Sequence, residues 1–274
     1  MDVFLPRTRR TFLADLGRGG IALAVVTIAG CAPGTGGASA SASANAAGPS
    51  AVPGGDASTA PSGTTAAPSA AATSGAPEDL AWERVNLGFV SAYVLVRGGE
   101  AAIVDTGVTG SEDEIEASLG RLGLDWSAVG HVVLTHKHPD HAGSAAAVLE
   151  RATEAVGYAG AADLGAITAP RPLTAVGDGD AVFDLEIVTT PGHTAGHIAV
   201  LDAAAGVLVA GDALGTASGT LAGSNPQFTE DAEAAKATVA KLGALRFETL
   251  LVGHGEPILT GAATQVAALA ASQG

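Results

Sequence analysis

The chain has 274 residues, with 13 basic against 28 acidic side chains and a formal net charge of −15. A surface this acidic repels phosphate backbones, so we exclude nucleic acid as a partner. The chain has one cysteine, Cys31, which excludes a disulfide within it.

Residues 1–31 have the pattern of an export signal. The pair Arg9-Arg10 precedes an apolar stretch that runs from about Ile21 to Ala29. This stretch is shorter than the roughly 20 apolar residues that a membrane-spanning helix needs. A basic head before a short apolar core is typical of a signal peptide, and the paired arginines resemble the twin-arginine type.

The apolar stretch ends in Ile28-Ala29-Gly30-Cys31, which resembles a bacterial lipobox. In a lipobox the cysteine becomes the lipidated first residue of the mature chain. The alternative is an ordinary secretory signal with an incidental cysteine. We expect lipidation, because small residues precede the single cysteine at the end of the apolar core. The expected location is the outer face of the cytoplasmic membrane, with a lipid anchor as the only membrane contact.

Residues 32–78 consist mainly of Ala, Ser, Gly, Thr and Pro. So few large apolar side chains cannot offset the entropy lost on ordering, and we expect a disordered linker. From residue 79 to 274 apolar and polar blocks alternate, and this length is sufficient to bury a core. We therefore predict one globular domain over residues 79–274, tethered by the linker.

The first half of this domain shows alternating strand and helix patterns. Phe89–Val96 and Ala101–Val104 are apolar, β-rich runs that predict a hairpin. Ser111–Leu122 has helical spacing, with Ser111 as the predicted N-cap and Glu114 completing a capping box. The next predicted elements are a strand at Val129–Leu134, a helix at Ala142–Arg151 and a strand at Glu154–Tyr158.

The second half begins with strand patterns and ends with helices. The predicted strands are Ala181–Phe183, Leu185–Thr189, Ile198–Leu201, Val207–Ala210 and Thr249–Val252. A helix is predicted over Thr229–Leu245 with Thr229 as its N-cap, and a last helix begins near Gly261. Strands mixed with helices in this order predict sheets with helices outside them.

Histidine and aspartate side chains follow the ends of these predicted strands. They are His136, His138, Asp140, His141, His193, Asp212 and His254. Groups that gather at strand ends on a rigid scaffold can form one site from distant parts of a sequence. We therefore expect these side chains to meet.

The segment His136-Lys137-His138-Pro139-Asp140-His141 has the spacing of a metal site. In an extended segment residues two apart point the same way, so His136 and His138 can hold one cation. Asp140 and His141 then face a second cation close by. Imidazole and carboxylate suit zinc, and also iron or manganese. The alternative, a polar loop with solvated histidines, is disfavoured by the further candidate ligands downstream.

A wider set of segments resembles the metallo-β-lactamase superfamily in residues, order and spacing. They are Asp105-Thr106-Gly107, Thr135–Gly143, Pro191–Thr194, Gly211-Asp212 and Gly253–Gly255, and the resemblance covers about Leu87 to Ile258. It implies an α/β (α+β) fold, a four-layer αββα sandwich with two metals, expected to be Zn²⁺, at one edge of the two sheets. It also implies the ligand sets: His136, His138 and His193 for the first metal, Asp140, His141 and His254 for the second, and Asp212 bridging both.

Such a metal pair generates hydroxide at neutral pH and polarises a substrate carbonyl. We expect Asp140 to orient that hydroxide. The domain lacks the cysteine ligand of the best-known metallo-β-lactamase subclass and has Asp212 at the bridging position, as glyoxalase II-like thioesterases and lactonases do. Ala213 follows Asp212, without the tyrosine typical of acyl-homoserine lactonases. We therefore expect a dinuclear hydrolase that cleaves an ester, thioester or lactone bond of a small-molecule substrate.

Three alternatives remain open. The first is a metallo-β-lactamase that acts on β-lactams. The second is an iron-dependent redox enzyme on the same scaffold, similar to the persulfide dioxygenases. The third is a metal-binding lipoprotein without catalysis, which the presence of both Asp140 and Asp212 disfavours.

Several residues outside the ligand set are expected to support it or to be structural. Asp105 is expected to hold a ligand histidine or its loop in place, the alternative being a turn-forming aspartate. His197 could support the metal loop, touch substrate or be structural. His131 is expected to be structural, and Lys137 to point away from the metals. Phe89, Tyr93 and Phe228 could line the substrate pocket, but core packing is the favoured expectation for each.

Overall fold

A computed structural model of the protein describes residues 79–273. The predicted signal peptide, the lipidation site at Cys31 and the linker over residues 32–78 lie outside the described residues. Within residues 79–273, every helix is too short or too polar to cross a lipid bilayer.

The first half of the described chain forms a six-stranded sheet in sequence order, β1 to β6. The strands are β1 (Ala81–Asn86), β2 (Ser91–Arg97), β3 (Glu100–Val104), β4 (Val129–Leu134), β5 (Val156–Gly160) and β6 (Thr174–Val176). β1, β2 and β3 pair antiparallel, whereas β3 to β6 pair parallel. The parallel pairing brings the carboxyl ends of these strands to one edge of the sheet.

The second half forms a five-stranded sheet in the order β13-β10-β9-β8-β7. Its strands are β7 (Ala181–Val182), β8 (Leu185–Thr189), β9 (Ile198–Asp202), β10 (Val207–Val209) and β13 (Thr249–Leu251). β13 joins β10 in parallel and the other pairs are antiparallel. A small ribbon of β11 (Leu214–Gly215) and β12 (Ala222–Gly223) follows β10.

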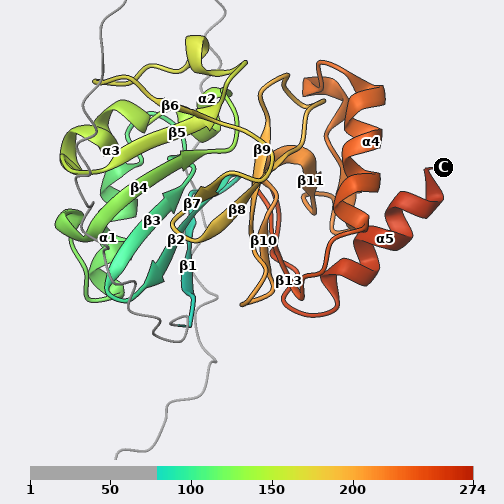
Figure 1. Cartoon of the computed structure of the whole chain (residues 1–274), viewed down its shortest axis with the longest axis horizontal. Helices are drawn as coiled ribbons and strands as arrows, with labels where there is room; N and C mark the ends of the chain where they lie inside the picture. Colours follow the sequence, from blue (N-terminus) through green and yellow to red (C-terminus); the bar gives the residue numbers. More distant parts are fainter. Residues whose placement is uncertain (1–78, 274) are drawn as a thin grey trace, which may run out of the picture. The chain divides into compact units, whose positions relative to one another are not determined.

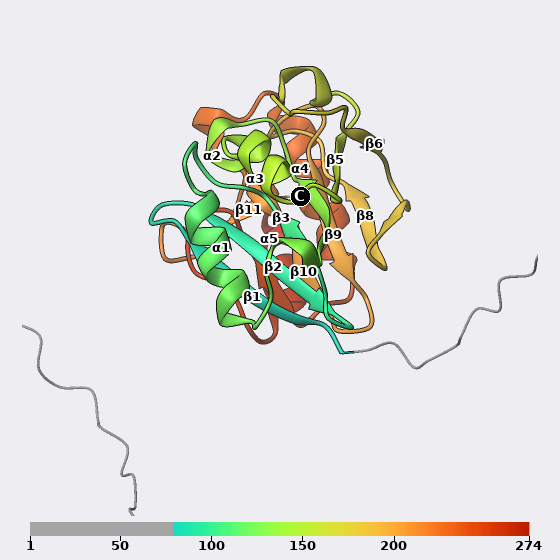
Figure 2. The same ribbon diagram turned by 90° about the vertical axis from the view of Figure 1, so that its left-hand side faces the viewer.

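Helices cover the outer face of each sheet (Figure 1). α1 (Glu112–Arg121), α2 (Pro139–Ala142) and α3 (Ala145–Arg151) lie on the six-stranded sheet, the face toward the viewer in Figure 2. α4 (Ala232–Gly243) and α5 (Ala262–Ser272) lie on the five-stranded sheet. The predicted four-layer αββα sandwich is therefore confirmed for the described residues.

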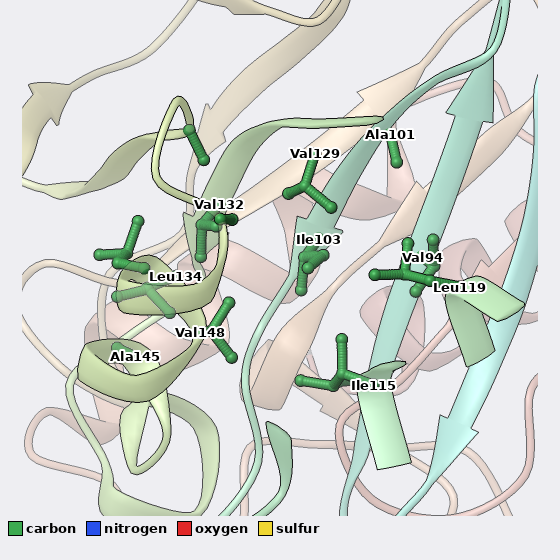
Figure 3. Packing of buried hydrophobic residues seen from close by; sticks show 14 of the residues in the cluster. Val94, Ala101, Ile103, Ile115, Leu119, Val129, Val132, Leu134, Ala145 and Val148 are labelled. Atoms are coloured by element: carbon green, nitrogen blue, oxygen red, sulfur yellow. The ribbon is translucent and has the colours of Figure 1, made fainter. Parts of the chain in front are cut away.

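Three apolar cores hold these layers together, one between each pair of neighbouring layers. Side chains of a strand alternate between faces, so Val94 and Ile103 pack under α1 and α3 (Figure 3), while Leu95 and Val104 face the other sheet. From α1, Leu119 is fully buried in the outer core. Burying a side chain of this size stabilises the fold by about 1.5–3 kcal/mol.

Of the two predicted helix caps, Ser111 is the N-cap residue of α1 but lacks the expected capping box, and Thr229 is not the cap of α4. The Ser111 side chain makes no capping hydrogen bond, so the expected capping box does not form. Its backbone (φ −85°, ψ 0°) lacks the extended conformation that a capping side chain needs. α4 begins at Ala232 with Asp231 as its N-cap, not at Thr229. The Thr229 hydroxyl donates instead to the Asn225 carbonyl oxygen at 2.7 Å.

Other differences concern where elements begin. The helix expected at Ala142–Arg151 is α2 followed by α3, and α2 starts at Pro139, which suits the first helical position because it needs no N–H partner there. β1, β6, β11 and β12 were not predicted. β1 is an edge strand with only Val85 buried, so it lacks the apolar run by which strands are found in a sequence.

Candidate metal centre

The predicted ligand residues meet where strands of both sheets end. His136 and His138 follow β4, and Asp140 and His141 lie on α2, directly after them. The second sheet supplies the others: His193 after β8, Asp212 in the turn Gly211–Ala213 after β10, and His254 after β13. Each residue is therefore positioned by a strand that ends at this edge.

His136, His138 and His193, here called the histidine group, present their ring nitrogens to one point. All the candidate ligand atoms of the group lie within 4.8 Å of one another. His136 Nε2 is 3.0 Å from His138 Nδ1, which is 2.9 Å from His193 Nε2. Nitrogens that converge in this way can share one cation.

Asp140, His141 and His254, here called the mixed group, form a second cluster within the same 4.8 Å limit. His254 Nε2 lies 3.3 Å from Asp140 Oδ2, and His141 Nε2 lies 3.9 Å from the same oxygen. The group combines two imidazoles with a carboxylate, and Asp140 and His254 are each partly exposed. The mixed group is therefore the more open of the two.

Asp212 stands between the two groups. Its Oδ2 is 3.3 Å from His193 Nε2 of the histidine group and 3.2 Å from His254 Nε2 of the mixed group. Its Oδ1 is 3.1 Å from His141 Nε2, yet this buried oxygen makes no hydrogen bond. A buried carboxylate oxygen without a hydrogen bond, surrounded by imidazole nitrogens, fits a metal ligand. The donor set, nitrogen and carboxylate oxygen, suits zinc, iron or manganese.

Burial dominates the electrostatics of the histidine group. It lowers the pKa of His193 to about 4, and it holds the pKa of His136 well below its ordinary value. Both rings are therefore neutral at physiological pH. The neutral imidazole is the form that offers a lone pair to a cation.

Carboxylates dominate the mixed group. Hydrogen bonds to Asp140 and Asp212 raise the pKa of His254 to about 10. Burial lowers the pKa of His141, but the charges of Asp212 and Asp105 outweigh it and hold this pKa well above its usual range. Burial likewise raises the pKa of Asp212, but His141 outweighs it and the carboxyl stays ionised. A cation in the mixed group therefore competes with protons for His141 and His254.

Asp105 lies behind His141. Its Oδ2 is 2.8 Å from His141 Nδ1, while its Oδ1 accepts the Thr135 N–H at 2.7 Å. Asp105 is buried and has a left-handed backbone, with φ +62°. This contact places the proton on Nδ1 and turns Nε2 of His141 toward Asp212.

His197 belongs to none of the ligand groups. It is buried, and its Nδ1 is 2.7 Å from the Thr190 hydroxyl. Its Nε2 accepts the backbone N–H of Asp212 at 3.1 Å. Because both ring nitrogens contact protein atoms and the ring is covered, His197 supports the turn that carries Asp212 and does not reach substrate.

The expectation of core packing is wrong for two of the three aromatic residues. Phe89 is 64% exposed and its ring stacks on His254, with centroids 6.2 Å apart. Its carbonyl oxygen lies 2.7 Å from His254 Nδ1. Phe228 is also exposed, whereas Tyr93 is buried and donates its hydroxyl to the Val252 carbonyl oxygen. Phe89 is therefore the aromatic residue that borders the mixed group.

Residues that the sequence did not single out also contact the ligand loops. Asp163 is fully buried and accepts hydrogen bonds from the loops of His138 and His193. Glu230 pairs with Lys137, whose ammonium nitrogen lies 2.7 Å from its Oε1. No motif in the sequence marks Asp163 or Glu230, because neither lies beside a ligand in the chain.

The family model of the metallo-beta-lactamase superfamily matches residues 85–254. "Hydroxyacylglutathione hydrolase" of Acidiphilium cryptum is 34% identical over 172 residues, 60% of this chain and 63% of that protein. "Probable metallo-hydrolase YflN" of Bacillus subtilis is 40% identical over 82 residues, 26% of this chain and 31% of that protein. The chain thus spans less than two thirds of the length of each relative.

Solved structures share the fold. The metallo-beta-lactamase family protein TTHA1429 of Thermus thermophilus aligns with a TM-score of 0.56 and 24% identity, over 70% of this chain and 78% of that one. The di-iron-bound form of TTHA1623 aligns with a TM-score of 0.55 and 24% identity, over 65% and 93%. At these identities the likeness shows a common architecture.

Proposed function

Because the chain belongs to the metallo-beta-lactamase superfamily, we propose that it is a dinuclear metal-dependent hydrolase that cleaves an ester, thioester or lactone bond. The observation that carries this proposal is the position of Asp212, whose Oδ2 lies 3.3 Å from His193 Nε2 and 3.2 Å from His254 Nε2. One carboxylate within reach of both groups can link two cations into one reaction centre.

The proposed roles differ between the two groups and Asp140. The histidine group would hold one cation and the mixed group the other, with Asp212 in reach of both. A bound cation pair supplies a nucleophile from water at neutral pH and polarises the substrate carbonyl. Asp140 is partly exposed, and the hydrogen bond from His254 lowers its pKa. Its ionised carboxylate can accept a hydrogen bond from the attacking water and set the direction of attack.

Among the candidate bonds we favour the thioester. Relatives that match part of this chain are named hydroxyacylglutathione hydrolase, and one of 27% identity is named "Thioesterase pkgB" of Emericella nidulans. We propose zinc as the metal, since imidazole and carboxylate suit it well. Iron is the alternative metal, because a structure of the same fold is known in a di-iron form.

A substrate panel on the full-length, zinc-loaded protein tests the proposal. It comprises a hydroxyacyl thioester, an aryl ester, a lactone and a β-lactam, each with and without a chelator. We expect thioester hydrolysis to be fastest and to fall to background with the chelator. Metal analysis of protein purified without added metal completes the test. Iron as the sole metal together with oxygen uptake, or no turnover of any substrate with both cations bound, would overturn the proposal.

A further inference from the structure

A fully buried carboxylate lies behind the histidine group. Asp163 follows β5 at the start of the short turn Leu164–Ala166, and its side chain is 0% exposed. Its Oδ2 accepts the Lys137 backbone N–H at 3.1 Å and the Thr194 hydroxyl at 2.6 Å. Its Oδ1 accepts the Gly196 N–H at 3.0 Å. One side chain that follows β5 thus binds two separate loops.

These two loops carry the whole histidine group. Lys137 stands between His136 and His138, and Thr194 directly follows His193. The convergence of the ring nitrogens to about 3 Å requires the loops to keep a fixed separation. Asp163 spans that separation from the buried side, because it bonds to the backbone of one loop and to backbone and side chain of the other.

Asp163 packs closely against Gly196. A Cβ atom at Gly196 would lie 2.5 Å from the Asp163 backbone nitrogen and 2.7 Å from its Cγ. Such distances are far below van der Waals contact. Glycine at position 196 therefore allows the close approach that lets the carboxylate reach the backbone of the loop.

An ion pair joins the same loops from the solvent side. Lys137 Nζ lies 2.7 Å from Glu230 Oε1, and Glu230 Oε2 accepts the Ala195 N–H at 3.0 Å. The Glu230 side chain is 43% exposed. Exposed ion pairs contribute about 0–1 kcal/mol, because water screens them. The buried carboxylate is therefore the stronger of the two links.

We propose that Asp163 is a positioning residue for the metal centre: it sets the distance between the His136–His138 loop and the His193 loop. It acts through these loops and touches no ligand atom. The inference rests on the proposed function only in requiring that the histidine group binds a cation. Groups that orient metal ligands in this way change metal affinity by roughly 10- to 100-fold when they are replaced.

The test measures Co²⁺ binding by the full-length protein and by Asp163→Asn. The amide of asparagine replaces one acceptor oxygen by a donor, which then faces an N–H or O–H group of one loop. We expect Co²⁺ affinity to fall by about 10- to 100-fold and the visible absorption of the bound cobalt to change. The absorption reports ligand geometry, which a loss of stability alone would leave unchanged.

Asp202→Asn is the matched control. Asp202, the last residue of β9, is also buried. It accepts the backbone N–H groups of Ala204 and Ala205 in the following turn and pairs with Arg97 of β2. We expect this variant to lose stability but to bind Co²⁺ as the wild type does. Thr194→Val removes one of the bonds to Asp163 and serves as a milder variant, expected to show an intermediate loss of affinity.

The outcomes separate this inference from the proposed function. If Asp163→Asn and Thr194→Val bind Co²⁺ with wild-type affinity and absorption, Asp163 does not position the ligands, whatever the enzyme cleaves. If the wild type binds Co²⁺ and hydrolyses none of the panel, the proposed function fails, while a weakened Asp163→Asn variant still supports the positioning role.

Discussion

The histidine group and the mixed group lie side by side but depend on different physical effects. In the histidine group burial keeps His136 and His193 neutral, so these two rings offer lone pairs without adding charge. In the mixed group Asp140 and Asp212 surround His141 and His254 with negative charge. A cation in the first group depends on geometry, and one in the second gains Coulomb energy in a partly buried setting. We therefore expect the two groups to respond to different substitutions.

The largest effect is expected from Asp212→Asn, which removes the charge shared by both groups. The amide can keep one ligand oxygen, but its NH₂ group, which cannot ligate a cation, replaces the second oxygen. We expect kcat/KM on the best panel substrate to fall by about 10²–10³-fold or more, as when a preorganised electrostatic group is lost. Steady-state kinetics with metal analysis of the same sample checks this.

Asp202→Asn is the control for that substitution, since it alters a buried carboxylate outside the ligand groups. It should keep kcat/KM within about threefold of the wild type, because Asp202 belongs to none of the candidate ligand groups. Equal losses in both variants would mean that Asp212 acts through stability, and the two groups would then not be coupled by it.

Asp140→Asn is expected to affect the mixed group and the reaction more than binding. His141 and His254 remain as ligands, so both cations should still bind when zinc is in excess. The attacking water loses its charged acceptor, and we expect kcat to fall by about 10²-fold, in the range of a lost general acid–base group. Full turnover of this variant with both metals bound would show that Asp140 has no role beyond coordination.

Asp105→Asn tests whether the two groups can be weakened separately. The amide oxygen can still accept the Thr135 N–H, but its NH₂ would face His141 Nδ1. His141 would then carry its proton on Nε2 and could not ligate a cation. We expect the affinity of the mixed group to fall by about 10- to 100-fold, while the histidine group is little changed.

Calorimetric Co²⁺ titration can distinguish this result from the effect of Asp163→Asn. If the groups are independent, each variant weakens one binding event and leaves the other, and the weakened event differs between them. If both variants weaken the same event, the division into two groups with separate supports is wrong.

The sequence was sufficient to predict the layers and the meeting of the candidate ligand residues. Strand ends such as Leu134 and Val209 are buried and apolar, and their polar successors stand out against them. The close spacing of His136, His138 and His141 in one segment predicts that these three candidate ligands lie together. The family match over residues 85–254 overlaps nearly all of the stretch from about Leu87 to Ile258 in which the sequence resembles the superfamily. The predicted export signal and lipidation at Cys31 stay predictions.

The supports of the site could not be predicted in the same way. Asp163 is distant in sequence from both loops that it joins, so only the folded chain shows its partners. The N-cap of α4 is Asp231 and not Thr229, although aspartate and threonine are both favourable cap residues. Phe89 was expected in the core because it is large and apolar, but it lies at the turn before β2. Tertiary contacts decide each of these cases.

The smallest effect is expected at His131, which isolates the influence of burial outside the metal centre. This β4 residue packs between the Tyr158 and Phe183 rings, and burial lowers its pKa although Glu100 opposes the shift. The folded protein therefore binds this proton less readily than the unfolded chain, whose histidines have a pKa of about 6.5. The stability that neutral His131 contributes is complete above that pH and is lost as the pH falls through the folded-state pKa.

His131→Phe should lose less unfolding free energy than the wild type between pH 7 and pH 5, measured by urea denaturation. An equal loss in both proteins would mean that burial does not affect this histidine, and the same explanation for the histidine group would be weakened.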